Sequence, residues 1–272
     1  MTTTTSQRSQ SEINGFFDDY YREHHRNPRA QGWRALAAGF NADLICAALE
    51  RVGAQPQRTV ELGCGDGAVI AELGHRGVGG KFVGYEIAAS AASFARSRAL
   101  PQAERIDVFD GEHVPEPDGS FDLALIVNVL EHAERPELLL REAARLAPLV
   151  LVQIVLTRNL LTRRPAHRRA QERTGHVHDL DPRGARAMLS QAGLPVLDEH
   201  VSMPPLAFRA YWAATRREQT KAVVVGGLSS LAPPLAGQLF ARDYTVVCRG
   251  AHRPTRFVRE GSGAPAEVAA NP

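Results

Sequence analysis

Short apolar runs alternate along residues 58–250 with segments in which apolar residues recur every three or four positions, the spacing of one helix face. Two of the runs, residues 121–128 and 149–156, are apolar almost throughout, which is typical of strands covered on both faces of a sheet. The pattern predicts strands at residues 58–64, 81–87, 105–109, 121–128, 149–156, 195–201 and 244–249 and helices at residues 66–75, 88–99, 136–146 and 181–192. Because strands that alternate with helices form parallel sheets through right-handed crossovers, we expect an α/β fold.

The two ends of the chain lack this pattern. Residues 1–12 are polar and residues 251–272 are rich in Gly, Pro and Ala, so we expect a disordered start and a flexible tail. Residues 13–57 include the stretch FFDDYY at residues 16–21, which is typical of an amphipathic helix. We therefore expect an N-terminal helical segment at residues 13–57 and one α/β domain at residues 58–250.

Composition and charge argue against several classes of function. The 32 basic and 30 acidic residues leave a net charge of +2, so no overall field would attract nucleic acid. The three cysteines form no CxxC pair, which fits a reducing compartment and argues against a zinc site. The uncharged run at residues 222–240 contains several Gly and Pro residues, which disfavour a membrane span. We expect a cytoplasmic monomer or homodimer that acts on a small molecule, without nucleic-acid or membrane partners.

The turn after the first expected strand is rich in glycine. Its sequence is ELGCGDG, with Gly63, Gly65 and Gly67 at alternate positions. Glycines let the backbone turn tightly and approach a ligand that a Cβ would obstruct. The next helix directs its N-terminal amides at the same place, and open α/β sheets bind ligands outside the carboxyl ends of their strands. The sequence therefore predicts a ligand site at this turn.

Glu86 ends the second expected strand, where a carboxylate can accept both hydroxyls of a ribose. Together with Gly63, Gly65 and Ala68 it satisfies the loose pattern of a dinucleotide site. A nicotinamide-dependent dehydrogenase is therefore one interpretation of this region.

Further acids favour S-adenosylmethionine over a dinucleotide. Glu61 stands two residues before the first glycine, where it can reach a ligand ammonium through water. Asp110 and Gly111 follow the third expected strand, placed to pair with the edge of an adenine. The fourth strand then ends in NVLEH at residues 128–132. A dinucleotide domain has no use for these features in this order.

Taken together, these motifs resemble those of the class I S-adenosylmethionine-dependent methyltransferases, especially their small-molecule branch. The matching segments are VELGCGDG at residues 60–67, VGYEI at 83–87, DGEHVPEPDGSFD at 110–122, NVLEH at 128–132 and GHVHDLDPRGARAMLSQAGL at 175–194. The resemblance implies a Rossmann-like, doubly wound and mostly parallel seven-stranded sheet with helices on both faces and an antiparallel last strand. It also implies that residues 13–57 form a lid over the cofactor.

The resemblance further implies which residues bind S-adenosylmethionine. They are Glu61, Gly63, Cys64, Gly65, Gly67, Glu86, Ile87, Asp110, Gly111 and Asn128. The implied activity is methyl transfer to an oxygen or nitrogen atom of a small metabolite, of the kind found in biosynthesis and secondary metabolism.

Candidate catalytic residues lie where the methyl group would emerge. His132, Glu131 and His178 are the candidates for a general base, which is needed only if the acceptor atom carries a proton. An insertion at residues 157–180 follows the fifth expected strand and contains arginines 158, 163, 164, 168, 169 and 173. These arginines favour an acceptor that bears a carboxylate or phosphate.

Several alternatives remain open. The same cofactor pocket serves transfer of the 3-amino-3-carboxypropyl group, and a protein that binds the cofactor without chemistry would keep the same motifs. Metal-assisted 2′-O-methyltransferases carry Glu-x-x-Glu-His where this chain has Asn128, Glu131 and His132. Because an amide is a poorer ligand for a hard cation than a carboxylate, we expect no metal.

Overall fold

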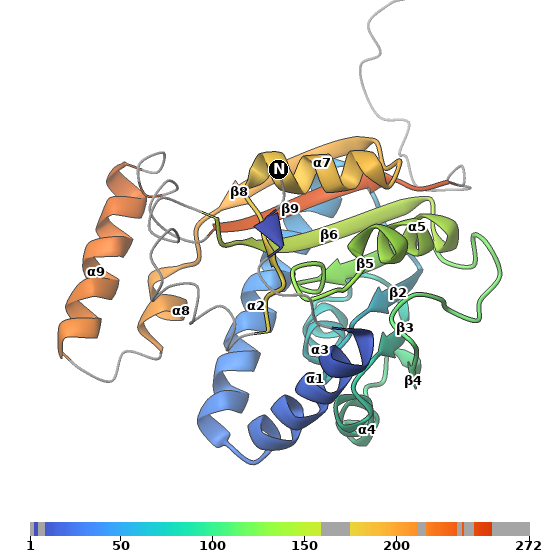
Figure 1. The fold of residues 1–272 in the computed structure, drawn as a ribbon, viewed down its shortest axis with the longest axis horizontal. Helices are drawn as coiled ribbons and strands as arrows, with labels where there is room; N and C mark the ends of the chain where they lie inside the picture. Colours follow the sequence, from blue (N-terminus) through green and yellow to red (C-terminus); the bar gives the residue numbers. More distant parts are fainter. Residues whose placement is uncertain are drawn as a thin grey trace, which may run out of the picture.

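A computed structural model describes residues 3–4, 9–158, 175–211, 216–232, 236 and 242–251. Its centre is a seven-stranded sheet (Figure 1). In spatial order the strands are β4 (Ala103–Val108), β3 (Lys81–Glu86), β2 (Arg58–Leu62), β5 (Leu123–Val127), β6 (Leu149–Leu156), β9 (Arg242–Arg249) and β8 (Val196–Ser202). The first five are parallel to one another, and β9 is antiparallel to both of its neighbours. The expected mostly parallel sheet with an antiparallel last strand is confirmed.

Helices cover both faces of the sheet, and an apolar core lies between the sheet and the helices on each face. On one face, α5 (Pro136–Leu146) and α7 (Pro182–Gln191) bury their apolar sides against β5 and β6. On the other face, α2 (Pro28–Arg51), α3 (Ala68–His75) and α4 (Ala89–Ser97) form a core with residues of β3, β4, β5, β6 and β9. Because both faces are covered there, the central strands β5 and β6 consist almost entirely of apolar residues with almost no exposed surface. The edge strand β4 is polar and more exposed.

The N-terminal segment consists of two helices that approach the carboxyl ends of the parallel strands. Helix α1 (Gln10–His25) begins with a capping box, in which the Ser9 side chain and Glu12 satisfy each other's backbone amides. It therefore begins inside the segment expected to be disordered. Asn27 caps α2, with Pro28 in its first turn. The Asp18 carboxylate accepts a hydrogen bond of 2.8 Å from the Ser90 N–H of α4, which attaches α1 to the sheet domain.

Four further elements lie away from the main sheet core. Strand β1 (Thr3–Thr4) pairs with β7 (His178–Asp179). Helices α8 (Leu206–Ala210) and α9 (Arg216–Leu231) lie beyond β8 and β9 in Figure 1. Within the described part of the chain, no helix is both long and apolar enough to cross a membrane. The expected flexible tail and most of the expected insertion lie outside the described residues.

Candidate functional site

A cavity of about 700 Å³ lies at the carboxyl ends of the parallel strands, beneath α1 and α2. Most of the residues predicted for the site line it: Glu61, Gly63, Cys64, Gly65, Glu86, Ile87, Gly111, Asn128, Glu131 and His132. Gly67, Asp110 and His178 are not among the lining residues. The sequence motifs therefore converge on one place, although they are spread over four strand ends.

The glycine turn after β2 has the close packing that the sequence predicts. Gly63 and Gly65 have φ angles of 78° and 55°, in the left-handed region that glycine adopts without strain. A Cβ on Gly63 would lie 2.4 Å from Cγ2 of Val129, and one on Gly65 would lie 2.3 Å from the Tyr21 hydroxyl. The turn is thus held between the loop after β5 and helix α1, and a side chain at either glycine would displace one of them.

Glu86 stabilises the turn from the end of β3. Its Oε2 accepts a hydrogen bond of 2.7 Å from the Gly65 N–H, and its Oε1 accepts one of 2.9 Å from the Ala88 N–H. Burial raises the pKa of this carboxyl, and the backbone hydrogen bonds offset only part of that effect. Glu86 therefore positions the glycine turn in addition to lining the cavity.

Glu61 is a buried carboxyl whose Oε2 has no hydrogen-bond partner among the described residues. Glu61 is only 1% exposed, and it lies on the cavity wall. Burial, followed by the nearby charges of Glu86 and Asp66, raises its pKa well above the ordinary value. An unpartnered carboxyl in such a place is stabilised by a cationic ligand group, such as an ammonium.

Arg34 and Asp66 form an ion pair beside the turn. Nη2 and Nε of Arg34 donate to the two carboxylate oxygens of Asp66, over 2.8 and 2.9 Å. Burial would raise the pKa of Asp66, but the hydrogen bonds and charge of Arg34 outweigh it and hold the pKa below its usual value. The guanidinium also lies 4.6 Å from the centre of the Tyr21 ring. Sequence reasoning missed this pair, because no local motif connects α2 to the glycine turn.

Another part of the cavity wall is formed by Ile87, Phe109, Gly111 and Gln10. Asp110 lies next to this wall, and its Oδ1 accepts hydrogen bonds of 2.8 Å from the N–H groups of Glu112 and His113. These hydrogen bonds lower its pKa despite partial burial. Asp110 thus shapes the loop after β4, and its predicted contact with adenine stays a prediction.

Two further residues predicted to bind the cofactor, Cys64 and Asn128, have surroundings that explain their residue types. Cys64 is buried on the cavity wall, and burial raises the pKa of its thiol well above the ordinary value, so the thiol stays protonated. Asn128 has a φ angle of 55°, which Asn tolerates better than most residues. Its backbone N–H donates to the Gln153 carbonyl of β6 over 2.9 Å, which fixes the turn at the end of β5.

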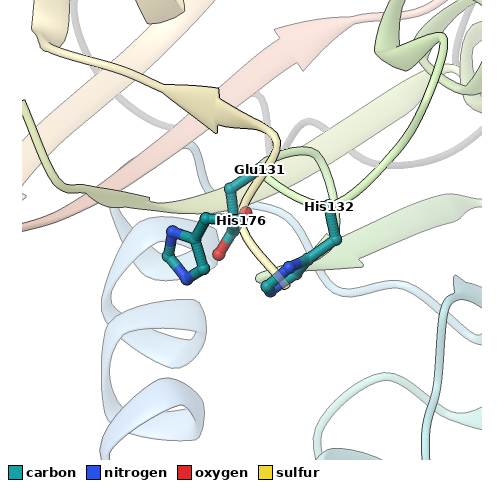
Figure 2. Close-up of side chains that lie close together, drawn as sticks. All are labelled: Glu131, His132 and His176. Carbon is teal, nitrogen blue, oxygen red and sulfur yellow. The ribbon is translucent and has the colours of Figure 1, made fainter. Parts of the chain in front are cut away.

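Three side chains meet beyond β5, where the loop after that strand approaches the segment before β7. Figure 2 shows the Glu131 side chain between the rings of His132 and His176. One ligand atom from each lies within 4.8 Å of the others, so this set could hold a metal ion. The ring centres of His132 and His176 are 4.6 Å apart, and that of Phe17 is 5.1 Å from His132.

The protonation of this cluster is set mainly by burial. Glu131 is fully buried, which raises its pKa to about 8. Burial lowers the pKa of His176 to about 3, so its ring is neutral at physiological pH. Neither carboxylate oxygen of Glu131 has a hydrogen-bond partner among the described residues. The cluster therefore combines a carboxyl that titrates near neutrality with a neutral imidazole.

His178 is not part of this cluster. Its Nε2 lies 2.9 Å from the carbonyl oxygen of Ala133, and it belongs to β7, outside the cavity lining. His176 contributes to the wall instead. Sequence reasoning named His178 as the candidate and had no signal that favoured His176 over it. The catalytic role expected of His178 has no support from the cavity geometry.

Aromatic residues close the remaining side of the cavity. Trp33 and Phe40 come from α2 and Phe208 from α8, and the Phe208 ring centre lies 5.3 and 6.1 Å from those of Trp33 and Phe40. Asp243, at the start of β9, lines the same end. Sequence reasoning missed all four, because their elements are far apart in the chain and carry no motif. Of the predicted arginines, only Arg158 is described, and its Nε lies 3.7 Å from Asp181.

Comparison with known proteins agrees with this geometry. Residues 60–148 match a family model described as a methyltransferase domain. Ajmaline N-methyltransferase of Rauvolfia serpentina is 28% identical over 156 residues, which are 53% of this chain and 54% of that protein. Norajmaline N-methyltransferase of the same plant is 29% identical over 96 residues, which are 34% of this chain and 33% of that protein. The chain thus matches about half, or less, of the length of these curated relatives.

Solved structures share the fold at low sequence identity. Geranyl diphosphate C-methyltransferase from Streptomyces coelicolor A3(2) superimposes with a TM-score of 0.57 at 14% identity, over 78% of this chain and 80% of that chain. The cyclase SpnF superimposes with a TM-score of 0.54 at 19% identity, over the same two shares. At these identities the likeness extends to the fold alone.

Proposed function

Because this chain carries a methyltransferase domain of the class I S-adenosylmethionine-dependent family, we propose that it transfers a methyl group from S-adenosylmethionine to a small-molecule acceptor. The observation that carries the proposal is the Oε2 of Glu61, which has no hydrogen-bond partner among the described residues and lies on the wall of a cavity that Ile87 and Gly111 also line. S-adenosylmethionine carries an ammonium, which suits Glu61, and an adenine, which we assign to the wall at Ile87 and Gly111. The chemistry that the bound cofactor supplies is a methyl group on a positively charged sulfur.

We assign two parts of the cavity wall to two different ligands. Strands β2, β3 and β4 end at the part lined by Glu61, Glu86 and Gly111, which we assign to the cofactor. Strands β5 and β6 end, and the antiparallel strand β9 begins, at the part lined by Glu131 and Asp243, which we assign to the acceptor. In-line attack on a sulfonium methyl requires the acceptor to be held next to the cofactor, and the continuous cavity provides that arrangement.

Glu131 and His132, both predicted as catalytic residues, line the acceptor part of the cavity. We assign to one of them the removal of a proton from the acceptor. An acidic acceptor remains a prediction, because residues 159–174, which contain most of the arginines behind it, lie outside the described residues. The names of the two curated relatives favour nitrogen as the methylated atom.

The by-product of the reaction tests the proposal. Methyl transfer leaves S-adenosylhomocysteine, whereas transfer of the aminocarboxypropyl group leaves methylthioadenosine. The purified protein is incubated with S-adenosylmethionine and a panel of small amines, phenols and acids, and the nucleoside products are separated by chromatography. Acceptor-dependent S-adenosylhomocysteine is the expected result. Methylthioadenosine as the acceptor-dependent product would contradict methyl transfer.

A further inference from the structure

The described wall of the cavity carries more acidic than basic side chains. Among the described lining residues, five carry a carboxyl group and one, Arg34, carries a permanent positive charge. The carboxyl groups belong to Glu61, Asp66, Glu86, Glu131 and Asp243. Arg34 is already paired with Asp66, and His176 is neutral. The described wall therefore favours a positively charged ligand and disfavours an anion.

Glu131 and Asp243 are the two described carboxyl-bearing residues in the part of the cavity that we assign to the acceptor. Glu131 follows β5, and Val155 at the end of β6 and Asp243 at the start of β9 line the cavity with it. It is 0% exposed, and neither oxygen has a hydrogen-bond partner among the described residues. Nearby backbone amides of Glu131 and Val155 offset only part of the effect of burial. Burial of an unpaired carboxylate costs free energy unless a proton or a cation joins it.

The surrounding wall suits a cation that is attached to an apolar group. Phe17, Trp33, Phe40 and Phe208 line the cavity together with Glu131. Aromatic faces attract organic cations and also bury apolar surface. An ammonium on an apolar or aromatic body satisfies both the carboxyl and this wall.

A metal ion is the competing partner for Glu131, because His132 and His176 lie close to it. Histidine ligands normally use their second ring nitrogen in a hydrogen bond that fixes the ring. Nδ1 of His176 is buried and has no hydrogen-bond partner among the described residues, so the orienting bond is missing if Nε2 is the ligand atom. Asn128 stands where a second carboxylate would add charge to such a site. The missing carboxylate favours an organic cation over a metal.

Building on the proposed methyltransferase activity, we propose that the acceptor is a primary or secondary amine with an apolar body, and that Glu131 binds its ammonium form and accepts one of its protons. The nitrogen lone pair then attacks the methyl carbon. The new C–N bond forms as the C–S bond breaks, and the electron pair of the C–S bond stays on sulfur. The products are neutral S-adenosylhomocysteine and a methylated ammonium, and the proton on Glu131 leaves to solvent.

The test compares amines with matched acids in the presence of S-adenosylhomocysteine. Tryptamine and phenethylamine are paired with indole-3-propionate and 3-phenylpropionate, and binding is measured by calorimetry with the full chain. We expect the amines to bind at least tenfold more tightly than their matched acids. Glu131→Gln is expected to remove that preference, whereas Glu134→Gln, an exposed glutamate three residues away, keeps it.

The outcomes separate this inference from the proposed function. One contrary result is that S-adenosylhomocysteine binds while amines and acids bind equally, or while the acids bind more tightly. Either form of this result overturns the proposed amine acceptor and leaves the proposed methyltransferase activity standing. Failure of the wild-type protein to bind S-adenosylhomocysteine overturns the methyltransferase itself. Stoichiometric zinc or manganese that is lost in Glu131→Gln and retained in Glu134→Gln would overturn the amine in favour of a metal. If Glu131→Gln fails to fold, the comparison of amines and acids on the wild type still decides.

Discussion

Arg34 of α2 holds Asp66 of the glycine turn through two hydrogen bonds of 2.8 and 2.9 Å, with Asp66 almost fully buried. This ion pair joins the N-terminal helices to the turn where the cofactor is proposed to bind. A buried pair contributes little when intact, but removal of one partner leaves an uncompensated charge.

We therefore expect Arg34→Met to lower the free energy of unfolding by about 3 kcal/mol at pH 7. Arg22→Met, which removes a cation from exposed ion pairs on α1, is the control and should cost less than about 1 kcal/mol. Urea unfolding measures both. Equal effects of the two substitutions would contradict the role of the buried pair.

The same pair predicts a pH dependence. Because the pKa of Asp66 is lower in the folded protein than its usual value, its contribution is present above the unfolded pKa, near 4, and is lost as the pH falls through the folded pKa. The stability difference between wild type and Asp66→Asn should therefore shrink as the pH is lowered below about 4. A difference that is constant between pH 7 and pH 3 would contradict this assignment.

Glu61→Gln separates cofactor binding from stability. The folded pKa of Glu61 is raised, so the folded protein loses stability as the pH rises from about 4.5 through that value. The substitution removes this loss, and we expect a ligand-free protein that is at least as stable at pH 8 as wild type. S-adenosylhomocysteine should bind at least tenfold more weakly. Methylthioadenosine lacks the ammonium and should bind as before; equal weakening of both ligands would contradict contact between Glu61 and the ammonium.

Gly63→Ala tests the packing of the turn. A Cβ there would lie 2.4 Å from Val129 and adopt a positive φ. Gly53 also has a positive φ, but nothing lies within 4 Å of an added Cβ, so Gly53→Ala reports the backbone strain of roughly 1–2 kcal/mol by itself. We expect Gly63→Ala to be more destabilising and to weaken binding of S-adenosylhomocysteine, and Gly53→Ala to leave that binding unchanged. Calorimetry and urea unfolding measure the two effects.

His132→Gln and Glu131→Gln identify the group that takes the proton. If Glu131 does so, Glu131→Gln should lower turnover of an amine by about 10²-fold or more. His132→Gln should then stay within about threefold of wild type. Radiolabelled methyl transfer measures both variants, with cofactor affinity as the control. The opposite ranking would assign the proton to His132.

The local pattern of apolar and polar residues was sufficient to predict most helices and strands of the sheet domain. The helix at Pro136–Leu146 and the strand at Leu149–Leu156 have the predicted bounds, because an apolar period and a proline at the helix start determine them locally. The place of β9 between β6 and β8 depends on contacts between distant segments, which periodicity does not encode. The cofactor motifs are local in the sequence and could be predicted from it. Trp33, Phe208 and Asp243 of the acceptor wall come from distant segments and could not.

The most direct test of the account is calorimetric binding of S-adenosylmethionine and S-adenosylhomocysteine to the purified protein, with NAD as the control ligand. We predict that both sulfur compounds bind in the micromolar range and that NAD does not. Tight binding of NAD without binding of either sulfur compound would contradict the central claim and make the chain a nicotinamide-binding protein on the same fold.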